Sequence, residues 1–194
     1  MVRSTRRLEK IRTVLSHRQP GLTVVMENIH DPHNVSAIFR SCDAVGVMRV
    51  ELLYSIEKFP RIGKKSSSSA NKWVEKRKHT SVDACFDTLR AEGFRILATR
   101  LGSGTNSLYD LDLTGQTAFV LGNEHRGISD EAAEKADECV HIPMMGMIES
   151  LNVSVAAAVC LYESFRQRLG VGMMNVPQLP QDVLDALTSS WTTL

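Results

Sequence analysis

Three polar segments of this 194-residue chain carry the side chains that could do chemistry. In the first, Arg40 stands almost two helical turns beyond Asn34, a residue type that caps helices. The second, 122–127, is a glycine-bounded loop that contains Glu124, and the third, 142–154, is a methionine-rich loop ending in Ser/Asn capping residues. Guanidinium, carboxylate and amide groups hold polar ligands by charge and hydrogen bonding.

Together the three segments outline one type of pocket. Loops with free backbone N–H and C=O groups can hold a planar base, apolar walls can hold a thioether or sulfonium, and a helix N-terminus favours a carboxylate. Taken singly, each segment has a plainer interpretation. These are a snorkelling arginine at a helix edge, a tight turn with solvated charge, and core packing followed by a helix cap.

Other familiar site patterns are absent or weak. The GSG segment at 102–104 follows a predicted strand, but no third glycine or helix follows, which disfavours a dinucleotide fingerprint. No GxxxxGK[ST] or GxSxG motif occurs, so a P-loop enzyme or a serine-elbow hydrolase has no support. The HDPH segment at 30–33 has no third ligand nearby, so we expect no metal site.

The composition is that of a soluble globular protein, with 43% hydrophobic and 23% charged residues. No apolar run approaches the ~18 residues of a membrane span, and the N-terminus lacks the apolar core of a secretory signal. The cysteines are far apart with no CxxC pair, which predicts reduced, mostly buried thiols in a cytoplasmic protein. They are Cys42, Cys85, Cys139 and Cys160.

Charge is unevenly distributed along the chain. Residues 1–20 carry six Lys/Arg and one Glu, and residues 58–78 carry eight Lys/Arg and one Glu. Because the whole chain is only +1, two basic stretches are attached to an acidic remainder. Clustered cations suit a polyanion such as nucleic acid, although a solvated basic helix and a surface loop would look the same.

Strand-like and helix-like patterns alternate, which predicts an α/β fold with a mainly parallel sheet, helices on both faces and ligands at the carboxyl ends of the strands. We expect loops over 55–73 and 101–113. The expected strands are 22–27, 47–54, 94–100, 117–122 and 138–143. The expected helices are 4–18, 36–46, 82–92, 130–137, 151–169 and one from Pro180 onward.

The three polar segments occur in the order of the three sequence motifs of the SPOUT superfamily of RNA methyltransferases, and they resemble those motifs. The matching stretches are NVSAIFRSCDAVG, LGNEHRGIS and IPMMGMIESLNVSVAAAV. The earlier stretch SHRQPGLTVVMENIHDPHN resembles the TrmH (SpoU) branch, which methylates the ribose 2′-oxygen of guanosine 18 in the tRNA D-loop. The resemblance covers roughly residues 5–175.

The resemblance implies a deep trefoil knot over about 93–165 and a homodimer with its active site beside the subunit interface. It implies a basic N-terminal helix (1–20), a methyltransferase domain (21–170) and a C-terminal helical extension (171–194). One side of the long helix is a suitable interface, at Val155, Val159, Tyr162 and Arg166.

The resemblance also assigns roles to individual residues. The catalytic and substrate positions of the family fall on Arg40, Asn34, Glu124, Ser150 and Asn152. Its S-adenosylmethionine contacts fall on Thr99, Gly122, Ile142 and Leu151. We expect tRNA to be gripped by the terminal helices and the basic loop, at Arg6, Arg7, Arg12, Lys64, Lys65 and Lys72.

The family mechanism makes the arginine at position 40 the base. A guanidinium has a pKa above about 12, so we expect Arg40 to grip a phosphate and stabilise the developing alkoxide instead. Two alternatives stay open. One is the same chemistry on another tRNA or rRNA ribose, and the other is a non-catalytic RNA-binding factor on a methyltransferase scaffold. The lack of an additional N-terminal RNA-binding domain favours tRNA.

Overall fold

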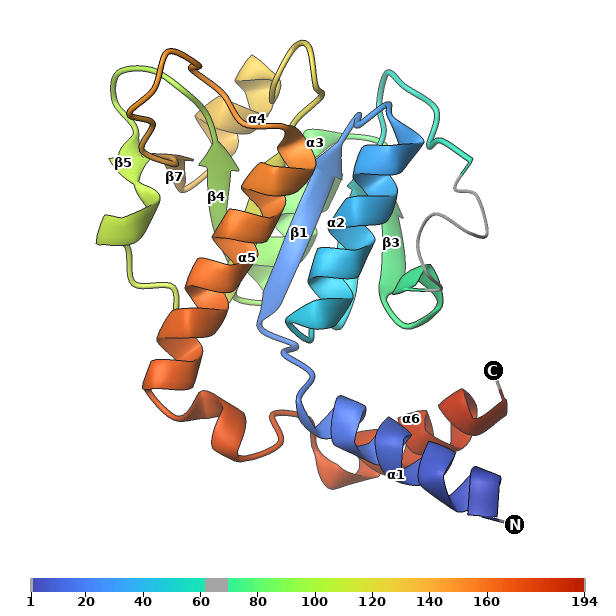
Figure 1. Ribbon diagram of the computed structural model, residues 1–194. Helices are drawn as coiled ribbons and strands as arrows, with labels where there is room; N and C mark the ends of the chain where they lie inside the picture. The colour runs from blue at the N-terminus through green and yellow to red at the C-terminus, as the bar shows by residue number, and fades with distance from the viewer. Residues whose placement is uncertain (1, 62–69, 194) are drawn as a thin grey trace.

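A seven-stranded sheet in which every strand pair is parallel forms the centre of the molecule (Figure 1). The computed structural model describes residues 2–61 and 70–193, and the side chains within them from residue 5 onward. The strand order is β3-β2-β1-β6-β4-β7-β5. The strands are β1 (Leu22–Glu27), β2 (Arg49–Leu53), β3 (Glu75–His79), β4 (Arg95–Thr99), β5 (Asn106–Ser107), β6 (Thr117–Leu121) and β7 (Glu138–His141).

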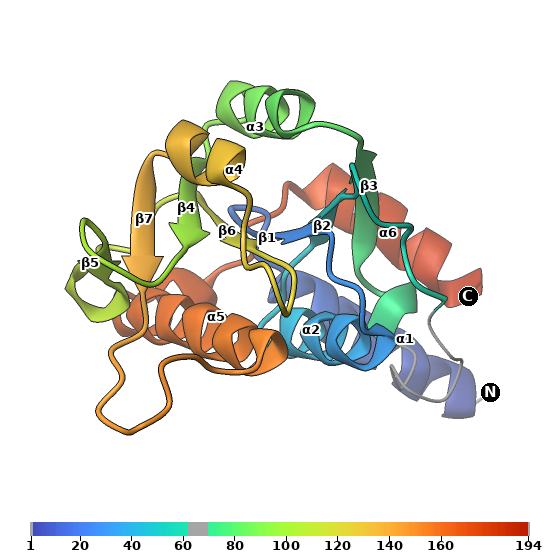
Figure 2. The ribbon, with the colours of Figure 1, turned by 90° about the horizontal axis from the view of Figure 1, so that it is seen from above.

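Helices cover both faces of this sheet (Figure 2). Helices α2 (Pro32–Ala44) and α5 (Val153–Gly170) lie on one face, and α3 (Val82–Ala91) and α4 (Asp130–Lys135) lie on the other. This confirms the predicted α/β fold with a parallel sheet and helices on both faces. Within the described part of the chain, no helix is both long and apolar enough to cross a membrane.

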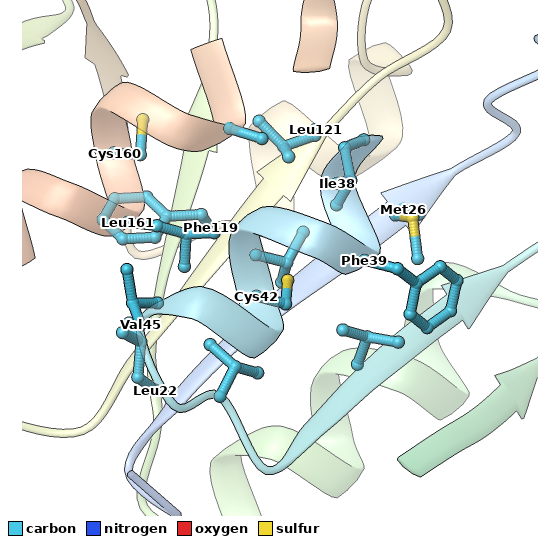
Figure 3. Packing of buried hydrophobic residues seen from close by; sticks show 14 of the residues in the cluster. Leu22, Met26, Ile38, Phe39, Cys42, Val45, Phe119, Leu121, Cys160 and Leu161 are labelled. Atoms are coloured by element: carbon cyan, nitrogen blue, oxygen red, sulfur yellow. The ribbon is translucent and has the colours of Figure 1, made fainter. Parts of the chain in front are cut away.

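Apolar side chains fill the space on each face of the sheet. On the α2/α5 face, Phe39, Phe119 and Leu161 belong to one buried cluster (Figure 3). On the opposite face, Phe86 of α3 and Ala132 of α4 join a second cluster. Full burial of one large apolar side chain contributes about 1.5–3 kcal/mol to the stability of the fold. The two apolar layers therefore fix the strands, and with them the loops that follow the strands.

The terminal helices α1 (Val2–Ser16) and α6 (Gln181–Thr193) pack against each other at the amino-terminal end of the strands (Figure 1). Their buried contact contains Ile11, Leu15 and Trp191. The ring of Trp191 lies 4.9 Å from that of Trp73, centroid to centroid, and 5.1 Å from the guanidinium of Arg18. The end of the 55–73 segment is therefore tied to the terminal helix pair.

Two fully buried arginines join segments that are distant in sequence. Arg18 donates to the carboxylate of Asp43 over 2.7 Å and to backbone carbonyls of Val47 and Trp73. Arg168 donates to the side-chain oxygen of Gln19 and to three backbone carbonyls, those of Leu113, Gly21 and Gly115. Burial lowers the pKa of Arg168 to about 10, so this side chain is still a cation at neutral pH.

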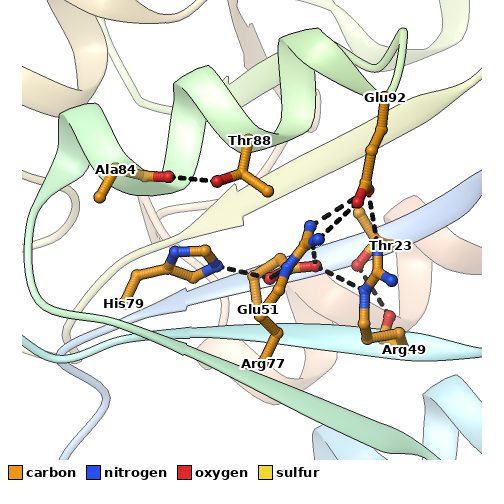
Figure 4. A network of polar contacts seen from close by, with 8 residues as sticks. All are labelled: Thr23, Arg49, Glu51, Arg77, His79, Ala84, Thr88 and Glu92. Carbon is orange, nitrogen blue, oxygen red and sulfur yellow. Dashed lines mark hydrogen bonds and ion pairs between the residues drawn. The ribbon is translucent and has the colours of Figure 1, made fainter.

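Strand β3 is missing from the sequence-based prediction, because its residues EKRKH show no apolar alternation. Two of its side chains, Arg77 and His79, contact the carboxylate of Glu51, which is fully buried in the neighbouring strand (Figure 4). Glu51 accepts hydrogen bonds from Arg77 over 2.8 Å and from Arg49 over 3.0 Å, and it lies 2.7 Å from Nε2 of His79. A buried carboxylate persists only with partners of this kind.

Smaller differences fall in the two expected loops. The 55–73 loop contains a short helix η1 (Ala70–Lys72), and its residues 62–69 are outside the described residues. The 101–113 loop contains β5 and the short helix η2 (Leu108–Asp110). A third short helix, η3 (Met173–Asn175), precedes α6. The other predicted elements are present within a few residues of their expected bounds.

Strand β7 lies between β4 and β5, although β4 and β5 follow each other directly in the chain. Strand β6, which follows β5, returns to a position between β1 and β4. Crossing connections of this kind are rare among folds. The strand order therefore fits the trefoil knot expected over about 93–165, and the knot itself stays a prediction.

Candidate active site

A cavity of about 840 Å³ opens at the carboxyl ends of β1, β4, β6 and β7. This is the edge at which parallel α/β sheets bind ligands. The wall is formed by the residues that directly follow these strands and by the start of α5. All positions predicted to contact the cofactor line it, namely Thr99, Gly122, Ile142 and Leu151.

Gly122 is required by a close approach of two backbone segments. A Cβ atom at this position would lie 2.1 Å from the carbonyl carbon of Gly127 and 2.1 Å from the nitrogen of Ile128. The approach is set by a tight hairpin, in which Asn123 and Gly127 exchange two backbone hydrogen bonds of 2.9 and 2.8 Å. Only glycine leaves the backbone of this cavity wall accessible.

Three of the predicted catalytic residues form one chain of hydrogen bonds. Nδ2 of Asn152 donates to Oδ1 of Asn34 over 3.0 Å, and Nδ2 of Asn34 donates to Oε1 of Glu124 over 2.9 Å. The expected capping role of Asn34 is wrong. Asp31 caps α2 by accepting a hydrogen bond from the N–H of His33, which leaves Asn34 in the first turn with its side chain directed at Glu124.

Glu124 is held as a carboxylate. Partial burial acts to raise its pKa, but hydrogen bonds from Asn34 and from the backbone N–H groups of His30 and Asp31 outweigh that effect. The pKa of Glu124 therefore lies below its ordinary value. At neutral pH the carboxylate is ionised and acts as a fixed hydrogen-bond acceptor between the loops after β1 and β6.

The loop before α5 places Ser150 and Asn152 in the cavity wall. Asn152 caps α5, because its Oδ1 accepts from the backbone N–H of Ser154 over 2.8 Å. Ser150 is exposed and makes no hydrogen bond to any described residue. Its hydroxyl is therefore available to a ligand.

Arg40 is separate from this group. It lies in α2, is exposed, and does not line the cavity. Among the described residues no carboxylate lies within ion-pair distance of it. The predicted catalytic residues are therefore not all brought together within one chain.

The expected RNA-binding residues differ from cations elsewhere in how they are paired. Arg6, Arg7 and Arg12 in α1 and Lys72 in η1 are exposed, and none forms an ion pair with a described residue. Several other cations are paired with carboxylates, as in Arg90–Asp137, Arg95–Glu138, Arg100–Asp130 and Lys135–Glu131. Lys64 and Lys65 are outside the described residues.

Sequence reasoning missed two asparagines at the cavity, Asn28 and Asn123. Asn28 directly follows β1, and Asn123 is the second residue after β6. Both side chains are buried. The side chain of Asn123 donates to the backbone carbonyl of Asn28 over 2.8 Å. Their signal in the sequence is only a polar amide at the end of an apolar run, which any turn would also show.

Metal and thiol chemistry have no support in the described residues. No group of three His, Cys, Asp or Glu side chains is arranged to hold a metal ion. Burial raises the pKa of the thiols of Cys85 and Cys160 to about 12, so both stay protonated and unreactive. Cys42 is also buried, and Cys139 is partly buried.

The chain has a parallel sheet with a crossing strand order and a ligand-sized cavity at the carboxyl ends of the strands. These features define the class of α/β proteins that bind a cofactor at this edge of the sheet. Residues 21–162 match the SpoU rRNA methylase family, and the chain belongs to this family.

Named relatives agree with this assignment. The tRNA (guanosine(18)-2′-O)-methyltransferase of Thermus thermophilus is 42% identical over 97% of each chain. The crystal structure of the Aquifex aeolicus TrmH/SpoU tRNA-modifying enzyme superimposes with a TM-score of 0.91 at 37% identity, covering 98% of this chain and 96% of that one. The SpoU methyltransferase AviRb of Streptomyces viridochromogenes, solved with AdoMet, gives a TM-score of 0.72 at 28% identity, covering 79% of this chain and 62% of that one.

Proposed function

We propose that this chain transfers a methyl group from S-adenosylmethionine to the ribose 2′-oxygen of guanosine 18 in tRNA. The observation that carries the proposal is the Asn152–Asn34–Glu124 chain beside a cavity lined by Thr99 and Gly122. The near full-length similarity to enzymes named for this activity supports the choice of substrate.

The residues around the cavity fit the methyl donor. Its volume lies within the roughly 300–1,000 Å³ of small-molecule sites. Leu101, Leu121 and Ile142 supply apolar walls, and the missing Cβ of Gly122 exposes backbone polar groups. When bound, S-adenosylmethionine supplies a methyl group activated by a positively charged sulfur.

In the reaction, a bond forms between the ribose 2′-oxygen and the methyl carbon, the carbon–sulfur bond breaks, and the hydroxyl proton leaves to solvent. The ionised Glu124 fixes Asn34, and Asn34 fixes Asn152 at the start of α5. Ser150 lies two residues before Asn152 in the cavity wall, where its free hydroxyl can bond to the ribose. Holding the reacting atoms about 3–3.5 Å apart is the main contribution such residues make.

Arg40 would act from a second copy of the chain. It does not line the cavity of its own chain and has no carboxylate partner among the described residues, so its guanidinium can grip an RNA phosphate and stabilise the developing alkoxide. A homodimer is supported by an apolar surface beside the cavity. Met145, Met147 and Ile148 are 95%, 100% and 71% exposed, and Val155 and Tyr162 of α5 are about half exposed.

The unpaired cations of α1 and η1, together with Lys64 and Lys65, would hold the tRNA. The N-terminal helix (1–20), the knotted methyltransferase domain (21–170) and the C-terminal extension (171–194) are the units we assign. Action on tRNA puts the enzyme in the cytoplasm.

The experiment that tests the function is mass-spectrometric mapping of ribose methylation on unmodified tRNA transcripts. We expect methylation at guanosine 18, and none on a transcript with 2′-deoxyguanosine there, which lacks only the acceptor oxygen. Methylation at another tRNA or rRNA ribose would overturn the substrate. Failure to bind S-adenosylhomocysteine in calorimetry would instead indicate a non-catalytic RNA-binding factor.

A further inference from the structure

Asn28 has an unusual backbone at the edge of the cavity. It is the only non-glycine residue in the described part of the chain with φ in the left-handed region, at 51°. Asparagine tolerates this conformation better than most residues, but it is uncommon. Asn28 is 5% exposed and lines the cavity, so the strained position is maintained next to the site.

The side chain of Asn28 organises the turn after β2. Its Oδ1 accepts hydrogen bonds from three consecutive backbone N–H groups, those of Ser55, Ile56 and Glu57, each over 3.1 Å. Its Nδ2 donates to the hydroxyl of Ser55 over 3.3 Å. This turn leads directly to Lys58 and Arg61, at the start of the basic segment.

The backbone of Asn28 is bound to the turn that carries Glu124. Its carbonyl accepts from Nδ2 of Asn123 over 2.8 Å, and Oδ1 of Asn123 accepts from the N–H groups of His125 and Arg126. Arg126 in turn forms a 2.9 Å ion pair with Glu57. Asn28 is therefore bound on one side to the 55–57 turn and on the other to the 122–127 hairpin.

We propose that Asn28 is a positioning residue for methyl transfer, because it holds the 55–57 turn and the Glu124 hairpin in one arrangement. The inference rests on the proposed function. RNA contacting Lys58 and Arg61 is thereby kept in a fixed relation to Glu124 and Asn34. Loss of the side chain should slow the transfer step while cofactor binding changes little.

Two variants separate the side chain from the backbone. Asn28→Gly keeps the left-handed backbone and its N–H and C=O groups but removes the acceptor. Asn28→Asp keeps an acceptor for the three N–H groups and replaces the amide donor next to the Ser55 hydroxyl with a carboxylate oxygen. Ser55→Ala is the matched control, since it removes the 3.3 Å hydrogen bond from Asn28 and keeps its own N–H.

Methylation of the tRNA transcript is measured at saturating donor, with calorimetry of S-adenosylhomocysteine and thermal melting alongside. We expect Asn28→Gly to lower kcat by about ten-fold or more, because small misplacements at a reacting site have large effects on rate. Asn28→Asp and Ser55→Ala should stay within about three-fold of the parent. The Kd for S-adenosylhomocysteine should change by less than about three-fold in every variant.

Several results would overturn the inference. These are an unchanged kcat in Asn28→Gly, an Asn28→Asp enzyme as slow as Asn28→Gly, or a loss of S-adenosylhomocysteine affinity that matches the loss of kcat. If Asn28→Gly does not fold, Asn123→Asp breaks the other connection of Asn28, the one to the 122–127 hairpin, by removing the donor to the Asn28 carbonyl. An unchanged kcat in that variant overturns the inference as well. A parent chain that methylates no RNA would contradict the proposed function instead.

Discussion

The side-chain amide of Asn152 donates to the side-chain oxygen of Asn34 over 3.0 Å, although 118 residues separate the two. Asn152 caps α5 and Asn34 lies in the first turn of α2, so the bond joins the amino ends of two neighbouring helices. Because Asn34 also donates to Glu124, one buried amide links the segments after β1, β6 and β7.

Replacement of this amide should disconnect the site. Asn34→Ala removes both hydrogen bonds, so we expect the free energy of unfolding to fall by about 1–3 kcal/mol and methyl transfer to fall by more than about ten-fold. Denaturant unfolding and single-turnover methylation measure these effects. His33→Ala is the control, because His33 is exposed and its backbone N–H still bonds Asp31. Equal losses in both variants would contradict a specific role for Asn34.

The ionisation of Glu124 predicts a pH dependence. Its pKa is lower in the folded chain than its ordinary value of 4.5, so the stabilisation it contributes is present above that value and is lost as the pH falls through the folded pKa. The stability difference between the parent and Glu124→Gln should be flat near neutral pH and shrink in acid. Denaturant titrations at several pH values measure it. A difference that grows in acid would mean that the carboxylate is not held in its ionised form.

Substitution of Arg40 should affect transfer and spare the donor site. Since Arg40 does not line the cavity, Arg40→Ala should bind S-adenosylhomocysteine as the parent does while methyl transfer falls by about a hundred-fold or more. Arg40→Lys keeps the charge but not the planar fork, so we expect only partial recovery. Calorimetry and initial rates separate the two effects. Turnover of Arg40→Ala within a few-fold of the parent would show that the assigned role is wrong.

Local patterns account for what the sequence could predict. Apolar runs are short-range features, so every expected strand and helix is present in the expected order, while β3 and the short strand β5 are missing from the prediction. The positions that surround the cavity came from a resemblance to a known family, and spacing alone leaves each segment with a plainer interpretation.

The features that were missed depend on long-range partners. Strand β3 is stable because Arg77 pairs with Glu51, which is 26 residues away and buried in another strand. Asn28 adopts its left-handed backbone opposite a turn 27 to 29 residues further along the chain. Neither partner can be identified from neighbouring residues, because charge and amide groups at these positions also suit a solvated surface.

A methyl group added at Gly122 should damage the cavity wall. In Gly122→Ala the new Cβ would meet the backbone of Gly127 and Ile128 at 2.1 Å, so the hairpin must shift. We expect the Kd for S-adenosylhomocysteine to rise by about ten-fold or more and stability to fall by about 1–3 kcal/mol. Gly115→Ala is the matched control, since nothing lies within 4 Å of a Cβ there. Unchanged affinity in Gly122→Ala would mean that this wall does not contact the donor.

Cations without a carboxylate partner should control the salt dependence of RNA binding. Arg12 and Lys72 are exposed and unpaired within the described part of the chain, so Arg12→Gln and Lys72→Gln should each reduce the slope of log K against log salt by about one. Cofactor affinity should not change, because neither residue lines the cavity. Arg90→Gln is the control, since Arg90 already pairs with Asp137 and is not among the residues assigned to the RNA surface. Filter-binding titrations of tRNA over a range of salt give the slope. If Arg90→Gln reduces this slope as much as Lys72→Gln does, the tRNA does not bind preferentially at the unpaired cations. The assigned RNA surface is then wrong.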